Sequence, residues 1–234
     1  MPSPVVEDAA ESEESGSGDF VPTMPSGIVA DSGILFVYGV RSNIAVTTPT
    51  GYVATGDIED DSSNRLWVFH RQATGDSNDD ITVAVGGFLR KTGIVHRISG
   101  HEDFATQAPE LSTGDVGESS DAPDPPDFTP TGGPKDFLAI AIGQIRETGG
   151  TQALTNDPSG YTPIHDIMSS GTTTGVITAT ARLALTAQSS ENPGAWLFDT
   201  SSRFIGLWVA VHPVAVAAGV FPPFKRKVNT LVRI

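Results

Sequence analysis

The sequence predicts an all-β protein, an antiparallel β-sandwich of jelly-roll type built from two similar halves, with extended N- and C-terminal arms. The chain of 234 residues holds 25 glycines and 17 prolines, a high share that is typical of a fold with many turns. Short runs of β-branched and aromatic residues lie between these turns, as expected of strands. The pattern Pro-x-Gly-Tyr occurs twice, at Pro49–Tyr52 and Pro158–Tyr161, which indicates two related halves.

Three further features accompany each copy of Pro-x-Gly-Tyr in the same order. An apolar run precedes the copy, a strand-like run follows it, and an apolar run that reaches a histidine closes the half. These runs are Ile34–Tyr38, Leu66–Phe69 and Gly93–His96 in the first half, and Phe137–Ile142, Thr180–Leu185 and Trp208–His212 in the second. The shared order predicts a duplication in which residues 33–100 correspond to residues 136–213, and both halves are expected to contribute to both sheets.

The N-terminal segment, residues 1–20, carries six acidic side chains and no basic one. Serine and glycine fill most of the gaps, so the segment offers too little apolar surface to offset the entropy lost on ordering. We therefore expect an acidic flexible arm that precedes a sandwich domain of residues 21–213. The alternative is an arm that becomes ordered on a neighbouring subunit.

Each expected element of the first half has a local reason. The nearly continuous apolar run at Gly33–Val40 indicates a strand buried on both faces. Pro49–Tyr52 is expected to form a turn, because proline fixes φ and glycine accepts a positive φ. An acidic loop is expected at Asp57–Asn64. The further strands expected in this half are Leu66–Gln72, Ile81–Val85 and Phe88–Ile98.

The rest of the chain divides into a connector, a second half and a tail. Residues 101–135 are rich in acidic residues and proline, which predicts a long surface connector. The strands expected in the second half are Phe137–Gln144, Gly175–Ala187, Ala195–Asp199 and Phe204–His212. Residues 214–234 lie beyond the repeat as a C-terminal extension with a basic tail.

Composition restricts the classes of function. The chain has 28 acidic and 14 basic residues, a net charge of −14, which argues against non-specific binding of nucleic acid. The absence of cysteine excludes disulfides, thiolate catalysis and zinc–thiolate sites. The first residues have neither the basic start nor the apolar core of a signal peptide. No apolar run reaches the 18 or so residues of a membrane span, so no membrane association is expected.

Neither a metal site nor a catalytic motif is predicted. His96, His101, Glu102 and Asp103 lie close in sequence, but their spacing matches no strong ligand pattern, so His96 is expected to end a strand and His101 to lie in a solvated loop. Asp76–Asp80 resembles a calcium loop in composition only. There is neither a Gly-x-Ser-x-Gly motif nor a phosphate-binding glycine loop. We expect no cofactor and no enzymatic activity, and a glycan hydrolase remains the third hypothesis.

A family resemblance rests on several of these motifs in combination. They are Ile34–Tyr38, Pro49–Tyr52, Leu66–Arg71, Arg97–Gly100, His101–Glu110, Asp124–Pro126 and Val209–Pro213. Over residues 20–213 the chain resembles a group of β-rich, virion-associated proteins of tailed bacteriophages and prophages. The resemblance implies a structural protein of the virion, such as a capsid decoration or cement protein, made in the bacterial host cytoplasm. The alternative is a tail-associated adhesin, a carbohydrate-binding module that contacts the host surface.

Two sets of residues are candidate contact sites. The C-terminal extension combines apolar and basic side chains, which favours an anchor to other virion proteins or to further copies in a homo-oligomer. The anchor residues are Phe221, Phe224, Lys225, Arg226, Lys227 and Leu231. Tyr52 and Tyr161 each follow a turn, and exposed tyrosines there could stack on host glycans. No catalytic, cofactor-binding or metal-binding residue is predicted.

Overall fold

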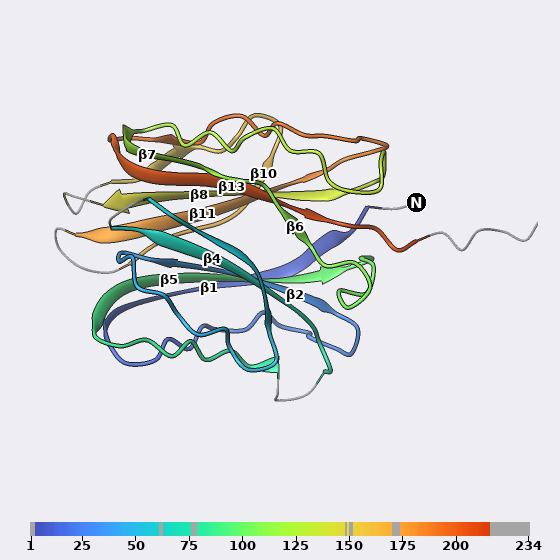
Figure 1. Cartoon of the computed structure of the whole chain (residues 1–234), viewed down its shortest axis with the longest axis horizontal. Coiled ribbons are helices and arrows are strands. Elements are labelled where there is room, and N and C mark those ends of the chain that lie inside the picture. Colours follow the sequence, from blue (N-terminus) through green and yellow to red (C-terminus); the bar gives the residue numbers. More distant parts are fainter. Residues whose placement is uncertain are drawn as a thin grey trace, which may run out of the picture.

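The computed structural model describes residues 3–60, 63–75, 79–147, 149, 152–169 and 174–215. Within these ranges every regular element is a strand and every strand pairing is antiparallel (Figure 1). The all-β, antiparallel prediction is therefore confirmed. A search of the same residues found no helix that could span a membrane.

Two large sheets and one small ribbon make up the described part of the fold. The first sheet has the order β1 (Val5–Ser17), β5 (Phe88–Ser99), β2 (Gly33–Val40), β4 (Arg65–Gln72) and β3 (Val53–Glu59). The second has the order β10 (Thr162–Met168), β11 (Gly175–Ala184), β8 (Leu138–Glu147), β13 (Ser202–Val211) and β6 (Glu110–Leu111), and β7 (Asp115–Ser120) also pairs with β13. The ribbon pairs β9 (Leu154–Asn156) with β12 (Leu197–Phe198).

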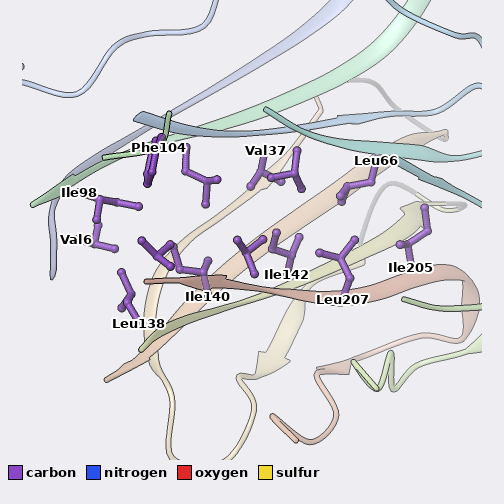
Figure 2. Packing of buried hydrophobic residues seen from close by; sticks show 14 residues of the cluster. Val6, Val37, Leu66, Ile98, Phe104, Leu138, Ile140, Ile142, Ile205 and Leu207 are labelled. Carbon is purple, nitrogen blue, oxygen red and sulfur yellow. The ribbon is translucent and has the colours of Figure 1, made fainter. Parts of the chain in front are cut away.

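The two large sheets pack face to face around an apolar core. Side chains such as Val37 and Leu66 from the first sheet meet Ile140, Ile142 and Leu207 from the second (Figure 2). All five are buried. The free energy gained by removing these side chains from water, about 1.5–3 kcal/mol each, holds the two sheets together as a sandwich.

The outer face of each sheet is buried as well, because loops fold over it. Phe20, Ile81 and Val83, which lie outside the strands, pack on the outer face of the first sheet. Tyr161 and Trp196 cover the second sheet in the same way. This double covering explains why all eight residues of β2 are buried, as its continuous apolar run predicts.

The prediction of a flexible N-terminal arm is wrong, because residues 5–17 form the edge strand β1 and belong to the sandwich. The strand pairs with β5 over its whole length, and two of its acidic residues, Asp8 and Glu14, lie opposite basic ones. Glu14 is opposite Lys91, whose side chain is fully buried, and their charged groups are 2.8 Å apart. Opposite charges across a strand pair stabilise it, so a segment too polar to fold alone becomes ordered on β5.

The expected mixing of both halves in each sheet is also wrong. All strands before residue 100 lie in the first sheet, and all strands of the second sheet lie between residues 110 and 211. Four strands of each sheet have the spatial orders β5-β2-β4-β3 and β13-β8-β11-β10. Numbered along the chain, each order is 4-1-3-2 and not the 4-1-2-3 of a Greek key, so the jelly-roll detail is not confirmed.

Three local predictions also need correction. Ile81–Val85 is not a strand: its alternating apolar residues are buried, but only Val83 forms a bridge, with Phe20. β3 extends to Glu59, into the expected acidic loop, and Asp60 then closes the turn by accepting hydrogen bonds from Ser63 and Asn64. The connector 101–135 is partly regular, because it contributes β6 and β7 to the edge of the second sheet.

Candidate functional site

A pocket of about 390 Å³ lies at the end of the sandwich where β13 ends. Two segments that are distant in sequence form its wall, because the Glu102 amide donates to the His212 carbonyl over 2.9 Å and His101 forms a bridge with Pro213. The side chain of Lys135, just before β8, reaches the same space. The residues that line the pocket are Glu102, Thr106, Gln107, Lys135, His212, Pro213 and Ala215.

The imidazole of His212, which lines this pocket, contacts a carboxylate. Glu110, the first residue of β6, places Oε1 2.7 Å from Nε2 of His212, whose side chain is 1 % exposed. The same carboxylate accepts hydrogen bonds from the amide and hydroxyl of Thr131. Burial alone raises the pKa of Glu110, but the hydrogen bonds from Thr131 and His212 outweigh burial and lower it. Glu110 is therefore an ionised, fully engaged acceptor.

Its surroundings favour the neutral form of His212. Burial lowers its pKa, and the nearby Glu110 carboxylate only partly offsets that effect. A neutral imidazole that donates from Nε2 to Glu110 leaves Nδ1 as an acceptor, and the Lys135 ammonium lies 3.4 Å from that nitrogen. The ring of Phe137 packs edge-on against the imidazole, with centroids 5.0 Å apart. These contacts fix both the orientation and the tautomer of His212.

The carboxylate–imidazole pair resembles the orienting part of a catalytic triad, but the third partner differs. Nucleophilic catalysis needs a hydroxyl or thiol within hydrogen-bond reach of the base. Nδ1 of His212 faces the Lys135 ammonium, and among the described residues no hydroxyl forms a hydrogen bond with that nitrogen. The arrangement is therefore suited to hold a small polar group beside a fixed cation, and it ties β6, β13 and the segment before β8 together.

The two tyrosines predicted to contact glycans are buried, so that prediction is wrong. Tyr52 is 6 % exposed and donates to the Asp79 carbonyl over 2.6 Å. Tyr161 is 8 % exposed and its hydroxyl lies 3.4 Å from Glu191. Burial is the main cause that raises the pKa of both phenols. Each side chain turns inward against the outer face of its own sheet and cannot stack on a sugar.

The turns that carry these tyrosines have the expected form. The Tyr52 amide donates to the Pro49 carbonyl over 3.0 Å, and the Tyr161 amide to the Pro158 carbonyl over 3.1 Å. The glycines before the tyrosines have φ values of 81° and 85°. A turn with positive φ at its third residue requires glycine there, which explains why both copies contain it.

The other histidines considered as ligands serve the fold. His96 lies inside its strand, fully buried between the Leu35 carbonyl and the Thr180 hydroxyl, and burial lowers its pKa to about 4. His101 is buried against Phe104 and is not in a solvated loop as expected. No cluster of three or more potential metal ligands occurs within the described ranges.

Two sequence predictions fall on residues beyond the described ranges. The anchor residues Phe221, Phe224, Lys225, Arg226, Lys227 and Leu231 all follow residue 215. The part of the calcium-like segment at residues 76–78 is also outside them, whereas Asp79 is buried and accepts from the amides of Thr74 and Gly75. Sequence reasoning missed the Glu110–His212 pair, because 102 residues separate the two and no local pattern marks them.

Comparison of the chain with family models, with curated proteins and with solved structures finds no match.

Proposed function

We propose that this protein is a non-enzymatic structural component of a tailed-phage virion, most simply a capsid decoration or cement protein. The motif resemblance supports the viral setting. The observation that carries the structural role is the use of polar side chains as ties between distant segments. Glu110–His212 joins the connector to β13, and His96–Thr180 joins the two sheets. Lys91–Glu14 holds the N-terminal strand to β5.

Further ties hold the first strand to the opposite sheet. The His165 ring of β10 contacts both the Ala9 carbonyl and the Glu11 carboxylate, at 3.1 and 3.2 Å. Arg182 of β11 donates to the Val6 carbonyl. An edge strand is normally open to pairing with other chains, and these side chains occupy part of that edge. The arrangement favours a subunit that keeps one shape on a particle surface.

We further propose that the two large sheets are copies of one unit, which would make the chain a fused pseudo-dimer. In the first sheet Gly33 of β2 is opposite Gln72 of β4, and in the second sheet Leu138 of β8 is opposite Ala184 of β11. Val53, just after Tyr52, is opposite His70, and Thr162, just after Tyr161, is opposite Arg182. His70 lies two positions before Gln72, and Arg182 lies two positions before Ala184, so the two tyrosines occupy corresponding places.

The hairpins and edges match as well. Both β3 and β10 carry an irregularity after their second residue. The histidine match expected from the sequence is wrong, however. His96 lies two residues before Ile98, the partner of Gly33, whereas His212 lies one residue after Val211, the partner of Leu138. Superposing the two four-stranded units in an experimental structure tests the duplication, and tyrosines at unmatched positions would contradict it.

The virion role is tested on particles of the phage that encodes the protein. Mass spectrometry and immunogold labelling of purified virions should detect the full chain, and head or tail labelling then separates decoration from the adhesin alternative. A variant without residues 221–234 should keep the β-sheet circular dichroism of the full chain but fail to enter particles. A protein that is made in infected cells yet missing from virions would refute the proposal, whereas normal incorporation of the truncated chain would refute only the anchor.

A further inference from the structure

Four arginines lie at the end of the sandwich opposite the pocket. Arg41 follows the last residue of β2, and Arg146 lies near the end of β8. Arg90 and Arg203 lie near the starts of β5 and β13, the neighbouring antiparallel strands. We call these four residues the arginine cluster. It contains four of the 14 basic residues of a chain whose net charge is −14.

The strand pattern turns all four side chains toward the space between the sheets. In β8, Ile140 and Ile142 belong to the core between the sheets, and Gln144 bonds the Arg65 carbonyl of the facing sheet. Arg146 is the next residue on that face, because alternate residues of a strand share a face. The other three arginines follow inward-facing residues of their own strands by the same rule. These residues are Val37 and Gly39 in β2, Thr92 in β5, and Ile205 and Leu207 in β13.

The same arginines occur at corresponding places in the two sheets. Arg41 lies eight residues after Gly33, and Arg146 lies eight residues after Leu138. Gly33 and Leu138 are the starting residues that the strand register makes equivalent. Arg41 of the first sheet therefore corresponds to Arg146 of the second.

The arginines of the neighbouring strands, β5 and β13, correspond in the same way. Arg90 lies eight residues before Ile98, and Arg203 lies eight residues before Val211. Ile98 and Val211 are the register partners of the two starting residues. Few other positions of these strands carry the same residue in both sheets, so the repeated arginines stand out against strands that otherwise differ.

Each arginine pair places like charges across neighbouring strands. The Arg41 amide donates to the Arg90 carbonyl over 3.0 Å. Ile145 is opposite Phe204, so the antiparallel register places Arg146 opposite Arg203. Like charges directly opposite one another destabilise a sheet. Burial and the Arg146 guanidinium lower the pKa of Arg41, the carboxylate of Glu147 offsets part of this, and Arg90 lowers it further.

Internal carboxylates neutralise little of the charge of Arg41, Arg146 and Arg203. Arg203 contacts Glu118, which is 85 % exposed, and donates to the Asp60 carbonyl of the facing sheet. Within the described part of the chain, no carboxylate forms a salt bridge with Arg41 or Arg146. The Nε atom of Arg146 is buried without a hydrogen-bond partner. Arg146 thus has an unused donor, and Arg41 lies beside like charges that an anion would offset.

We propose that the arginine cluster binds a multivalent oxyanion between the ends of the two sheets. Guanidinium groups bind carboxylate and phosphate oxygens through two parallel hydrogen bonds, so both chemistries fit. The arrangement of two arginine pairs, one in each sheet, suits a ligand with two charged ends, such as a diphosphate or a dicarboxylate group. This inference concerns binding alone and is independent of the virion proposal.

Calorimetric titration with inorganic pyrophosphate and, separately, with citrate tests the proposal at constant ionic strength set by sodium chloride. Wild type should bind at least one of the two anions, and the stronger one identifies the phosphate or carboxylate source. The double variant Arg41→Gln/Arg146→Gln should bind at least tenfold more weakly. The matched control Arg97→Gln/Arg182→Gln removes the same charge near the opposite end, where β5 and β11 end, and should keep the wild-type affinity.

Circular dichroism and melting curves show whether the variants fold. Without ligand, Arg41→Gln/Arg146→Gln should melt no lower than wild type, because it removes two repelling charges. Three outcomes would overturn the proposal: no binding of either anion to wild type, an equal loss in both double variants, or binding of a short oligonucleotide without binding of the small anions. A lower melting temperature with no pyrophosphate effect on wild type would assign the arginines to folding alone.

Discussion

The substitution Glu14→Gln should destabilise the protein, because it leaves the Lys91 ammonium buried without its carboxylate. The Lys91 side chain is fully buried, and its Nζ lies 2.8 Å from Glu14 and 2.9 Å from the Gly18 carbonyl. Breaking a buried ion pair by removing one partner costs about 3–5 kcal/mol. Because Glu14 is 36 % exposed and the Gly18 carbonyl remains, we expect about 1–3 kcal/mol.

Thermal unfolding followed by circular dichroism measures this loss. A change of 1 kcal/mol shifts the melting temperature of a protein of this size by about 2–4 °C, so the expected decrease is about 2–12 °C. Asp19→Asn removes the same charge from an exposed position just after β1 and should change stability by less than about 0.5 kcal/mol. Adding Lys91→Met to Glu14→Gln should restore much of the loss, because an apolar side chain needs no carboxylate there.

Equal melting temperatures for wild type, Glu14→Gln and Asp19→Asn would refute the reasoning. That result is what a disordered acidic arm predicts, because a solvated segment contributes nothing to the free energy of unfolding.

Three other substitutions test separate parts of the fold. Burial lowers the pKa of His96 from 6.5 to about 4, so the unfolded chain binds a proton at a higher pH than the folded chain does. Stability should therefore fall as the pH drops from 6.5 to 4, and the urea midpoints of His96→Gln should vary less than those of wild type over that range. Gly39→Ala would place a Cβ 2.4 Å from a threonine hydroxyl of the facing sheet and should lower the free energy of unfolding by about 1–3 kcal/mol in chemical denaturation. At Gly86 an added Cβ meets no described atom within 4 Å, so the control Gly86→Ala should lower it by less than about 1 kcal/mol. Glu110→Gln removes the charged acceptor of the pocket imidazole and should cost about 1–3 kcal/mol by thermal unfolding, and a loss no larger than that of Asp115→Asn on β7 would contradict that role.

The sequence alone determined the local features of this protein. Burial of β2 on both faces follows from a run of eight residues without a charged side chain, and the structure buries all eight. The turn at Pro49–Tyr52 follows from the conformations that proline and glycine accept, which depend on no distant contact. The other expected strands that were found, such as Leu66–Gln72 and Phe204–His212, also carry their signal in neighbouring residues.

Only the tertiary structure decided which distant segments meet. Nothing near β1 predicts a strand, because its order depends on basic residues of β5 that follow about 80 positions later. The tyrosine after each turn looks free to face solvent until the loops close over the outer face of the sheet and bury it. The pairing of Glu110 with His212 likewise requires β6 to lie beside β13, and the arginine cluster requires both sheets in place. Such contacts depend on chain topology, and a local pattern carries no information about it.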